Sequence, residues 1–144
     1  MSVDNITQSI LLVRGRKVLL DAELAALYGV TTKRFNQQVQ RNLERFPEDF
    51  MFQLTDHEVA SLRLQIVTLD IHAGGRGRHR KYRPYAFTEH GAIMAASILN
   101  SPRAIETSVY VVRAFVRLRE LLASNTELAR RLDELEARLT QKFD

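Results

Sequence analysis

The chain has 144 residues, of which 45% are hydrophobic, so it is long enough for one domain with a buried core and an additional helix. The absence of cysteine excludes a disulfide scaffold and thiolate metal sites. Its 21 Lys and Arg against 17 Asp and Glu give a net charge of +4, a mildly basic balance that suits a polyanionic partner. No stretch reaches the roughly 18 apolar residues of a membrane span, and MSVDNITQS lacks the features of a secretory signal. We therefore expect a cytoplasmic protein that does not bind membranes.

The first predicted elements are a β-hairpin and a helix. Two β-forming runs, at residues 10–13 and 18–20, flank a polar turn that contains Gly15. Asp21 is a favourable N-cap for a helix over residues 22–27, and Gly29 is placed to end that helix.

A second helix is predicted directly after Gly29. Thr31 or Thr32 can cap it, and it should run to about Leu43. Its apolar residues Phe35, Val39 and Leu43 recur every four positions, which predicts one buried face.

The middle of the chain predicts a strand, a helix and a loop. Residues 50–54 are rich in aromatic and apolar side chains and are expected to form a strand. Thr55 and Glu58 have the spacing of a capping box, which opens a helix to about Val67. Residues 70–83 combine glycines with basic side chains and are expected to form an exposed loop.

The last third of the chain is predicted to be mostly helical after a short strand at residues 85–87. Thr88 can cap a helix that runs through Ile98, and Pro102 marks the first turn of the next helix. From there to Lys142 no Pro or Gly interrupts the pattern, which predicts one very long helix or two in tandem.

Residues 21–43 have the pattern of a helix-turn-helix. The small residue Ala25 lies four positions before Gly29, where the two helices would cross closely. The expected buried seam comprises Leu24, Tyr28, Val30, Phe35 and Val39. The second helix would then present a polar face made of Lys33, Arg34, Asn36, Gln37, Gln40 and Arg41.

The side chains of this face are of the types that contact DNA. Arg pairs with guanine, Asn and Gln pair with adenine, and cations contact phosphates. No acidic residue lies between Glu23 and Glu44, so nothing in this segment repels phosphate. The alternative is an ordinary helical hairpin with a solvated polar face.

A second basic element lies in the Gly-rich loop. No acid intervenes between Asp70 and Glu89, so the loop could follow a phosphate backbone or enter the minor groove. The alternative is a solvated loop without a partner. The cations predicted to contact DNA are Arg76, Arg78, Arg80, Lys81 and Arg83, with His79 among them.

The C-terminal segment carries a heptad pattern that predicts dimerisation. Leu118, Asn125, Leu132 and Leu139 occupy a positions, and Leu121, Leu128 and Leu135 occupy d positions. A lone Asn at an a position favours a parallel two-stranded coiled coil in fixed register. The alternative is that the stripe packs on its own domain, which we expect for residues 111–118.

Motifs for catalysis or metal binding are not evident. The four histidines, His57, His72, His79 and His90, form no HExxH or i, i+4 pair, and no Walker or dinucleotide motif is complete. The rival functions are a protein-interaction module with an incidental basic surface and a metal-dependent nuclease. A variant in which RNA replaces DNA is disfavoured, because few aromatic residues accompany the basic groups.

Four runs of sequence resemble the ORF-six-N-terminal domain, a relative of the KilA-N and Bro-N domains of phages, prophage-bearing bacteria and large DNA viruses. The runs are VLLDAELAALYGVTTKRFNQQVQRN, RFPEDFMFQLT, YAFTEHGAIMAASILNS and VVRAFVRLRE, and they span roughly residues 8–120. The resemblance implies a DNA-binding module, found in regulators and antirepressor-like phage proteins, without catalytic residues. It also implies that the LYGV-to-RN segment faces DNA. The loop GGRGRHRKYR departs from the family, in which it is usually shorter and less basic.

Together these observations predict an α+β fold of KilA-N type. Short strands should pack on several helices over residues 8–120, and a coiled-coil helix should occupy residues 121–144. The expected function is non-enzymatic binding of double-stranded DNA, by a homodimer joined through the C-terminal helix, without a cofactor or small-molecule substrate.

Overall fold

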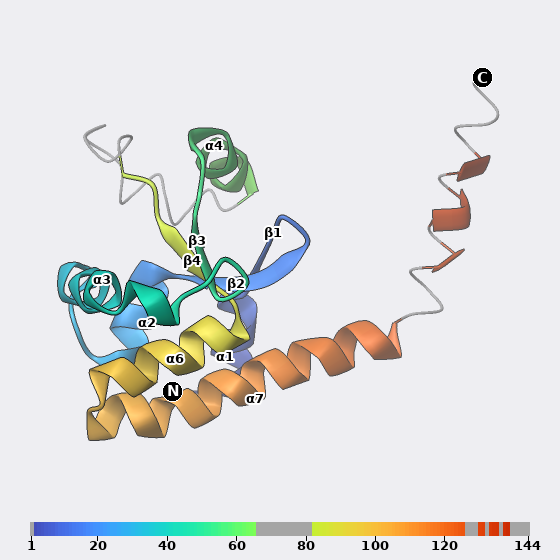
Figure 1. Cartoon of the computed structure of the whole chain (residues 1–144). Coiled ribbons are helices and arrows are strands. Elements are labelled where there is room, and N and C mark those ends of the chain that lie inside the picture. Colours follow the sequence, from blue (N-terminus) through green and yellow to red (C-terminus); the bar gives the residue numbers. More distant parts are fainter. Residues whose placement is uncertain (1, 66–81, 126–129, 132, 136, 139–144) are drawn as a thin grey trace.

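The computed structural model describes residues 2–65, 82–125, 130–131, 133–135 and 137–138 of the chain. These residues form the predicted α+β fold, in which a small antiparallel sheet is packed on helices and a long helix runs along one edge of the molecule (Figure 1). The elements are α1 (Val3–Ser9), β1 (Leu11–Val13), β2 (Arg16–Leu20), α2 (Asp21–Tyr28), α3 (Thr32–Arg41), the 3-10 helix η1 (Leu43–Arg45), β3 (Met51–Gln53), α4 (Asp56–Gln65), β4 (Tyr85–Phe87), α6 (Glu89–Leu99) and α7 (Pro102–Ser124).

The predicted hairpin is confirmed, and its turn has a specific local cause. β1 and β2 pair in antiparallel register with Val13 opposite Arg16, so two residues form the turn. Arg14 and Gly15 both have positive φ angles, 54° and 73°. Two successive positive φ angles twist a two-residue turn in the sense that matches the strands it joins.

The sheet has the strand order β1-β2-β4-β3, and every neighbouring pair is antiparallel. β3 and β4 confirm the strands predicted at residues 50–54 and 85–87. The capping box is also confirmed, because the Glu58 N–H donates to Thr55 Oγ1 and the Thr55 N–H donates to Glu58 Oε1. α4 is described to Gln65, and the predicted continuation to Val67 lies outside the described residues.

Helices α6 and α7 form an antiparallel pair beneath the sheet (Figure 1). Thr88 caps α6 as predicted, and Asn100 ends it in the left-handed conformation. The start of α6 approaches β3 so closely that a Cβ on Gly91 would lie 2.0 Å from the carbonyl oxygen of Phe50. Glycine is therefore required at this point of contact between helix and sheet.

The main hydrophobic core connects the α2–α3 pair to the sheet and to the α6–α7 pair. It contains buried residues from α2 and α3, from the sheet and from α6 and α7. One prediction about this region needs correction, the burial of Leu43. Leu43 is 48% exposed, because α3 ends at Arg41 and the chain turns into η1, which rotates Leu43 away from the face of Phe35 and Val39.

The C-terminal helical region consists of α7 and of helical residues beyond it. α7 ends at Ser124, and Asn125 is its C-cap, with the Asn125 amide donating to the Leu121 carbonyl oxygen at 2.8 Å. Helical conformation is seen again at residues 130–131, 133–135 and 137–138. Residues 126–129 and 139–144 lie outside the described residues, so the choice between one long helix and two in tandem stays a prediction beyond Asn125. Val111 and Phe115 are buried in the core, as expected for residues 111–118.

Candidate nucleic-acid interface

The turn between α2 and α3 is built by short-range contacts. Gly29 has a φ of 78°, and the Val30 N–H donates to the Ala25 carbonyl at 3.0 Å, so the last turn of α2 is closed. The Thr31 hydroxyl then accepts from the Arg34 N–H at 3.1 Å and caps α3. Both the predicted stop and the predicted start are confirmed.

The inner face of α3 is fixed in the core. Phe35 and Val39 are buried, and the Phe35 ring meets the Phe87 ring edge-on with the centroids 5.2 Å apart. Leu24 and Tyr28 are buried on α2, whereas Val30 is half-buried beside them. The predicted seam is therefore confirmed, and it leaves the opposite face of α3 free to meet a partner.

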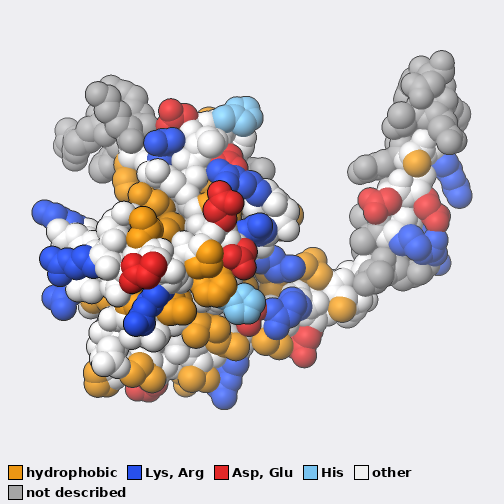
Figure 2. All heavy atoms as spheres, viewed as in Figure 1, with side chains coloured by type: hydrophobic (Ala, Val, Ile, Leu, Met, Phe, Trp, Pro, Cys, Tyr) orange, Lys and Arg blue, Asp and Glu red, His pale blue; other side chains and the backbone are white. Residues whose placement is uncertain are grey.

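The outer face of α3 carries cations and amides. Lys33, Arg34, Gln37, Gln40 and Arg41 are all exposed. Within the described residues none of its three cations has a salt-bridge partner, and α3 contains no acid. Lys and Arg side chains gather on the part of the surface formed by α3, at the left of Figure 2. The Gln40 Nε2 lies 3.4 Å from the Tyr85 hydroxyl, a long contact that places Gln40 beside β4.

Asn36 does not belong to this outer face, which corrects the sequence-based assignment. Its Nδ2 donates to Asp21 Oδ2 at 2.9 Å, and its Oδ1 is buried with no hydrogen-bond partner among the described residues. On a helix of 3.6 residues per turn, Asn36 lies at the edge of the polar arc, next to the buried row. It therefore joins α3 to the start of α2 instead of facing solvent.

Asp21 is the centre of a buried polar junction that the sequence did not predict. It is not the N-cap of α2 but its first residue, and it is fully buried. Its carboxylate accepts from the Ala22 N–H at 2.7 Å and from the Tyr85 N–H at 3.3 Å, in addition to Asn36. The Tyr82 hydroxyl also donates to it. Burial, reinforced by this hydrogen bond to Asp21, raises the pKa of the Tyr82 phenol well above its usual range.

Tyr82 brings the described end of the basic segment to α3. Arg83, directly after it, is exposed. The side-chain amide of Gln53 donates a hydrogen bond from its Nε2 to the Arg83 carbonyl oxygen at 3.1 Å. One of the loop cations predicted to contact DNA is therefore placed close to the α2–α3 junction. The others, Arg76, Arg78, Arg80 and Lys81, lie outside the described residues.

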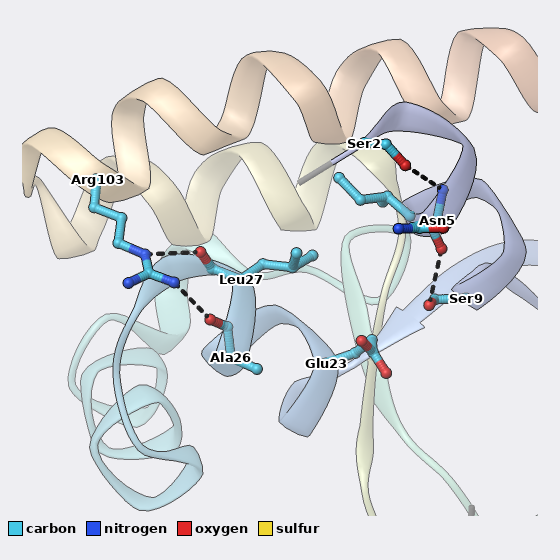
Figure 3. Close-up of a pocket in the computed structure, with 8 residues that line it drawn as sticks. Ser2, Asn5, Ser9, Glu23, Ala26, Leu27 and Arg103 are labelled. Carbon is cyan, nitrogen blue, oxygen red and sulfur yellow. Dashed lines mark hydrogen bonds between the residues drawn. The ribbon is translucent and has the colours of Figure 1, made fainter.

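The turn at Gly29 is also held by a residue far away in the sequence. Arg103, at the start of α7, donates to the carbonyl oxygens of Leu27 at 3.3 Å and Ala26 at 3.4 Å (Figure 3). Its side chain lies so close to Gly29 that an added Cβ would be 2.7 Å from Arg103 Cδ. Arg103 could not be predicted from the sequence, because the contact joins residues that no local pattern relates.

The residues predicted for dimerisation are placed in part. Leu121 and Leu135 are exposed, and Asn125 uses its amide to cap its own helix. Leu128, Leu132 and Leu139 lie outside the described residues. α7 therefore ends next to Asn125, one of the predicted a positions, and dimerisation through the heptad pattern stays a prediction.

The described residues contain no group of three or more His, Cys, Asp or Glu side chains placed to hold a metal ion. In the same part of the chain, no helix combines the length and the apolar character needed to cross a membrane.

Comparison with known proteins gives one match. A family model described as the ORF6N domain matches residues 8–98, which run from α1 through α6 and include the α2–α3 pair. Neither the search of curated proteins nor the search of solved structures finds a match to the chain.

Proposed function

The chain belongs to the ORF6N domain family, and from that premise we propose that it binds duplex DNA through the exposed face of α3. The observation that carries the proposal is the composition of this face. Lys33, Arg34 and Arg41 supply cations without salt-bridge partners among the described residues, and Gln37 and Gln40 supply amides beside them. An α-helix fits the major groove, where cations contact phosphates or guanine and glutamine reads adenine.

The contacts that fix α3 in the fold also support DNA binding. A base-reading helix must be held within a fraction of an ångström by the residues behind it. Phe35 packs against Phe87, and Asn36 is bonded to the buried Asp21. The side chains on the outer face are thus presented from a helix that is fixed on two sides.

The basic segment before β4 would supply phosphate contacts. Arg83 is exposed next to Tyr82, which is anchored at the junction of α2 and α3. We expect Arg83 and the cations of residues 76–81 to position the protein on the backbone while α3 reads bases. The role that fits a module of this kind is regulation of transcription, as a repressor, activator or antirepressor in the cytoplasm.

The test is titration of fluorescent random duplex DNA with the purified protein, followed by anisotropy at several salt concentrations. Wild type should bind, and its affinity should fall steeply as salt increases, because bound cations release counterions from DNA. Arg34→Glu/Arg41→Glu should lose binding at every salt concentration.

The matched control is Arg16→Glu/Lys17→Glu, which makes the same change in net charge on the β1–β2 hairpin, away from α3 in Figure 1. It should bind with nearly wild-type affinity, and circular dichroism should show that both variants are folded. Absence of wild-type binding at low salt contradicts the proposal and favours a protein-interaction module. Magnesium-dependent cleavage of plasmid DNA would instead identify a nuclease.

A further inference from the structure

α7 has a partly exposed apolar stripe beside the row that faces the core. Ile105 and Val109 are 51% and 47% exposed, and Val112 and Val116 are half-buried further along the helix. Their spacing of four, three and four residues places all of them on one side of a helix. The core-facing side is a different row, which includes Val111 and Phe115. In Figure 1 α7 lies along the lower edge of the molecule, with α6 on its inner side.

The two halves of this stripe differ in shape. Ile105 and Val109 stand out from the surface, whereas Val112 and Val116 line a hollow of about 500 Å³ between α7 and the start of α1. Val3 lines the same hollow from α1, so part of its wall is apolar. The protruding half and the hollow half are seven residues apart, which is about 10 Å along a helix axis.

A surface that carries a protrusion and a hollow on one helix can bind a copy of itself. A two-fold axis perpendicular to α7, passing beside the helix midway between Val109 and Val112, places Ile105 of each copy opposite Val116 of the other, and Val109 opposite Val112. We propose that α7 pairs in antiparallel orientation with α7 of a second copy, and that this stripe is the centre of an isologous dimer interface. The proposal does not rest on DNA binding.

The charges beside the stripe select the antiparallel orientation. Glu106 and Arg113 are exposed on the same flank, seven residues apart, and within the described residues neither has a salt-bridge partner. The same two-fold axis brings Glu106 of each copy close to Arg113 of the other, which makes two intermolecular ion pairs. A parallel pair in register would instead place the two Glu106 side chains on opposite flanks of the interface, and neither ion pair with Arg113 could form.

The natural absence of cysteine allows a direct test by cross-linking in the full chain. Glu106→Cys and Arg113→Cys are made separately, and one of them carries a C-terminal tag that changes its mass. After mild oxidation of the mixture, a non-reducing gel should show the mixed dimer in excess over either same-variant dimer. A disulfide within one chain cannot form, because each chain carries a single cysteine.

Charge exchange tests the same interface without a covalent bond. In sedimentation equilibrium, Arg113→Glu should weaken the dimer about tenfold or more, and Glu106→Arg/Arg113→Glu should restore it. Val109→Asp should give a folded monomer. Three results would overturn the proposal: a monomeric wild type, preferential cross-linking of Glu106→Cys to itself, or a dimer that survives Val109→Asp and dissociates in Leu128→Asp/Leu132→Asp.

Discussion

The basic side chains of the β1–β2 hairpin and those of α3 differ in whether they have partners within the fold. The β1–β2 hairpin has the denser basic run, yet Arg14 is paired with Glu58 through two hydrogen bonds of 2.7 and 2.9 Å, and Arg16 donates to the Glu48 carbonyl at 2.9 Å. The cations of α3 have no such partners among the described residues. Basic residues in a sequence therefore indicate a nucleic-acid surface only when the fold leaves them unpaired.

The largest effect is expected where α3 is anchored. Asp21→Asn replaces a carboxylate oxygen with a donor in a buried site that offers four donors, from Ala22, Asn36, Tyr82 and Tyr85. The free energy of unfolding should fall by about 3 kcal/mol, because buried donors lose a charged acceptor. Urea denaturation measures it, and an unchanged midpoint would show that the junction does not hold α3.

The second largest effect is expected when the cations on the outer face of α3 are neutralised. In Lys33→Gln/Arg34→Gln/Arg41→Gln we expect DNA affinity to fall on the order of 100-fold, since each cation neutralises a phosphate. The slope of log affinity against log salt should become shallower by about 2.7 for three lost contacts. A wild-type slope in this variant would place the DNA contacts elsewhere. The free energy of unfolding should stay unchanged.

Asn36 and Gln37 are neighbours in the chain and should behave differently. Asn36→Ala removes a hydrogen bond to Asp21 and should lower the free energy of unfolding by about 1 kcal/mol. Gln37→Ala should leave stability unchanged and weaken binding to a selected DNA site. If urea denaturation and anisotropy gave the reverse pattern, the assignment of inner and outer residues on α3 would be wrong.

The smallest effect is expected at the hairpin. Arg14 lowers the pKa of Glu58 from its ordinary value of 4.5 to about 2, chiefly through its side-chain hydrogen bond. Because the carboxyl pKa is lower in the folded state, the pair stabilises the fold above about pH 4.5 and loses this effect as the pH falls toward 2. Arg14→Gln should lower the urea midpoint slightly at pH 7 and not at pH 2. The effect on stability is small, since exposed ion pairs contribute little. DNA affinity should stay within about twofold of wild type, because Arg14 lies on the hairpin and is paired with Glu58.

The helix boundaries that depend on residues close together in the sequence could be predicted. Gly29, Thr31 and the Thr55–Glu58 pair act through contacts within a few residues, so the helix boundaries they set could be predicted. The role of Asp21 could not, because its partners come from positions up to 64 residues away. The same limit explains why Asn36 was assigned to the outer face.

The position of Arg103 has a practical consequence for work with fragments of this protein. The family match ends at residue 98, yet the guanidinium that closes the α2–α3 turn and the buried residues Ala104, Val111, Ala114 and Phe115 all come from α7. A fragment cut at residue 98 would expose the apolar side of α6 and remove the hydrogen bonds that Arg103 donates to the carbonyl oxygens of Leu27 and Ala26. We therefore expect a fragment that folds on its own to include α7, and recombinant fragments should be designed with that boundary.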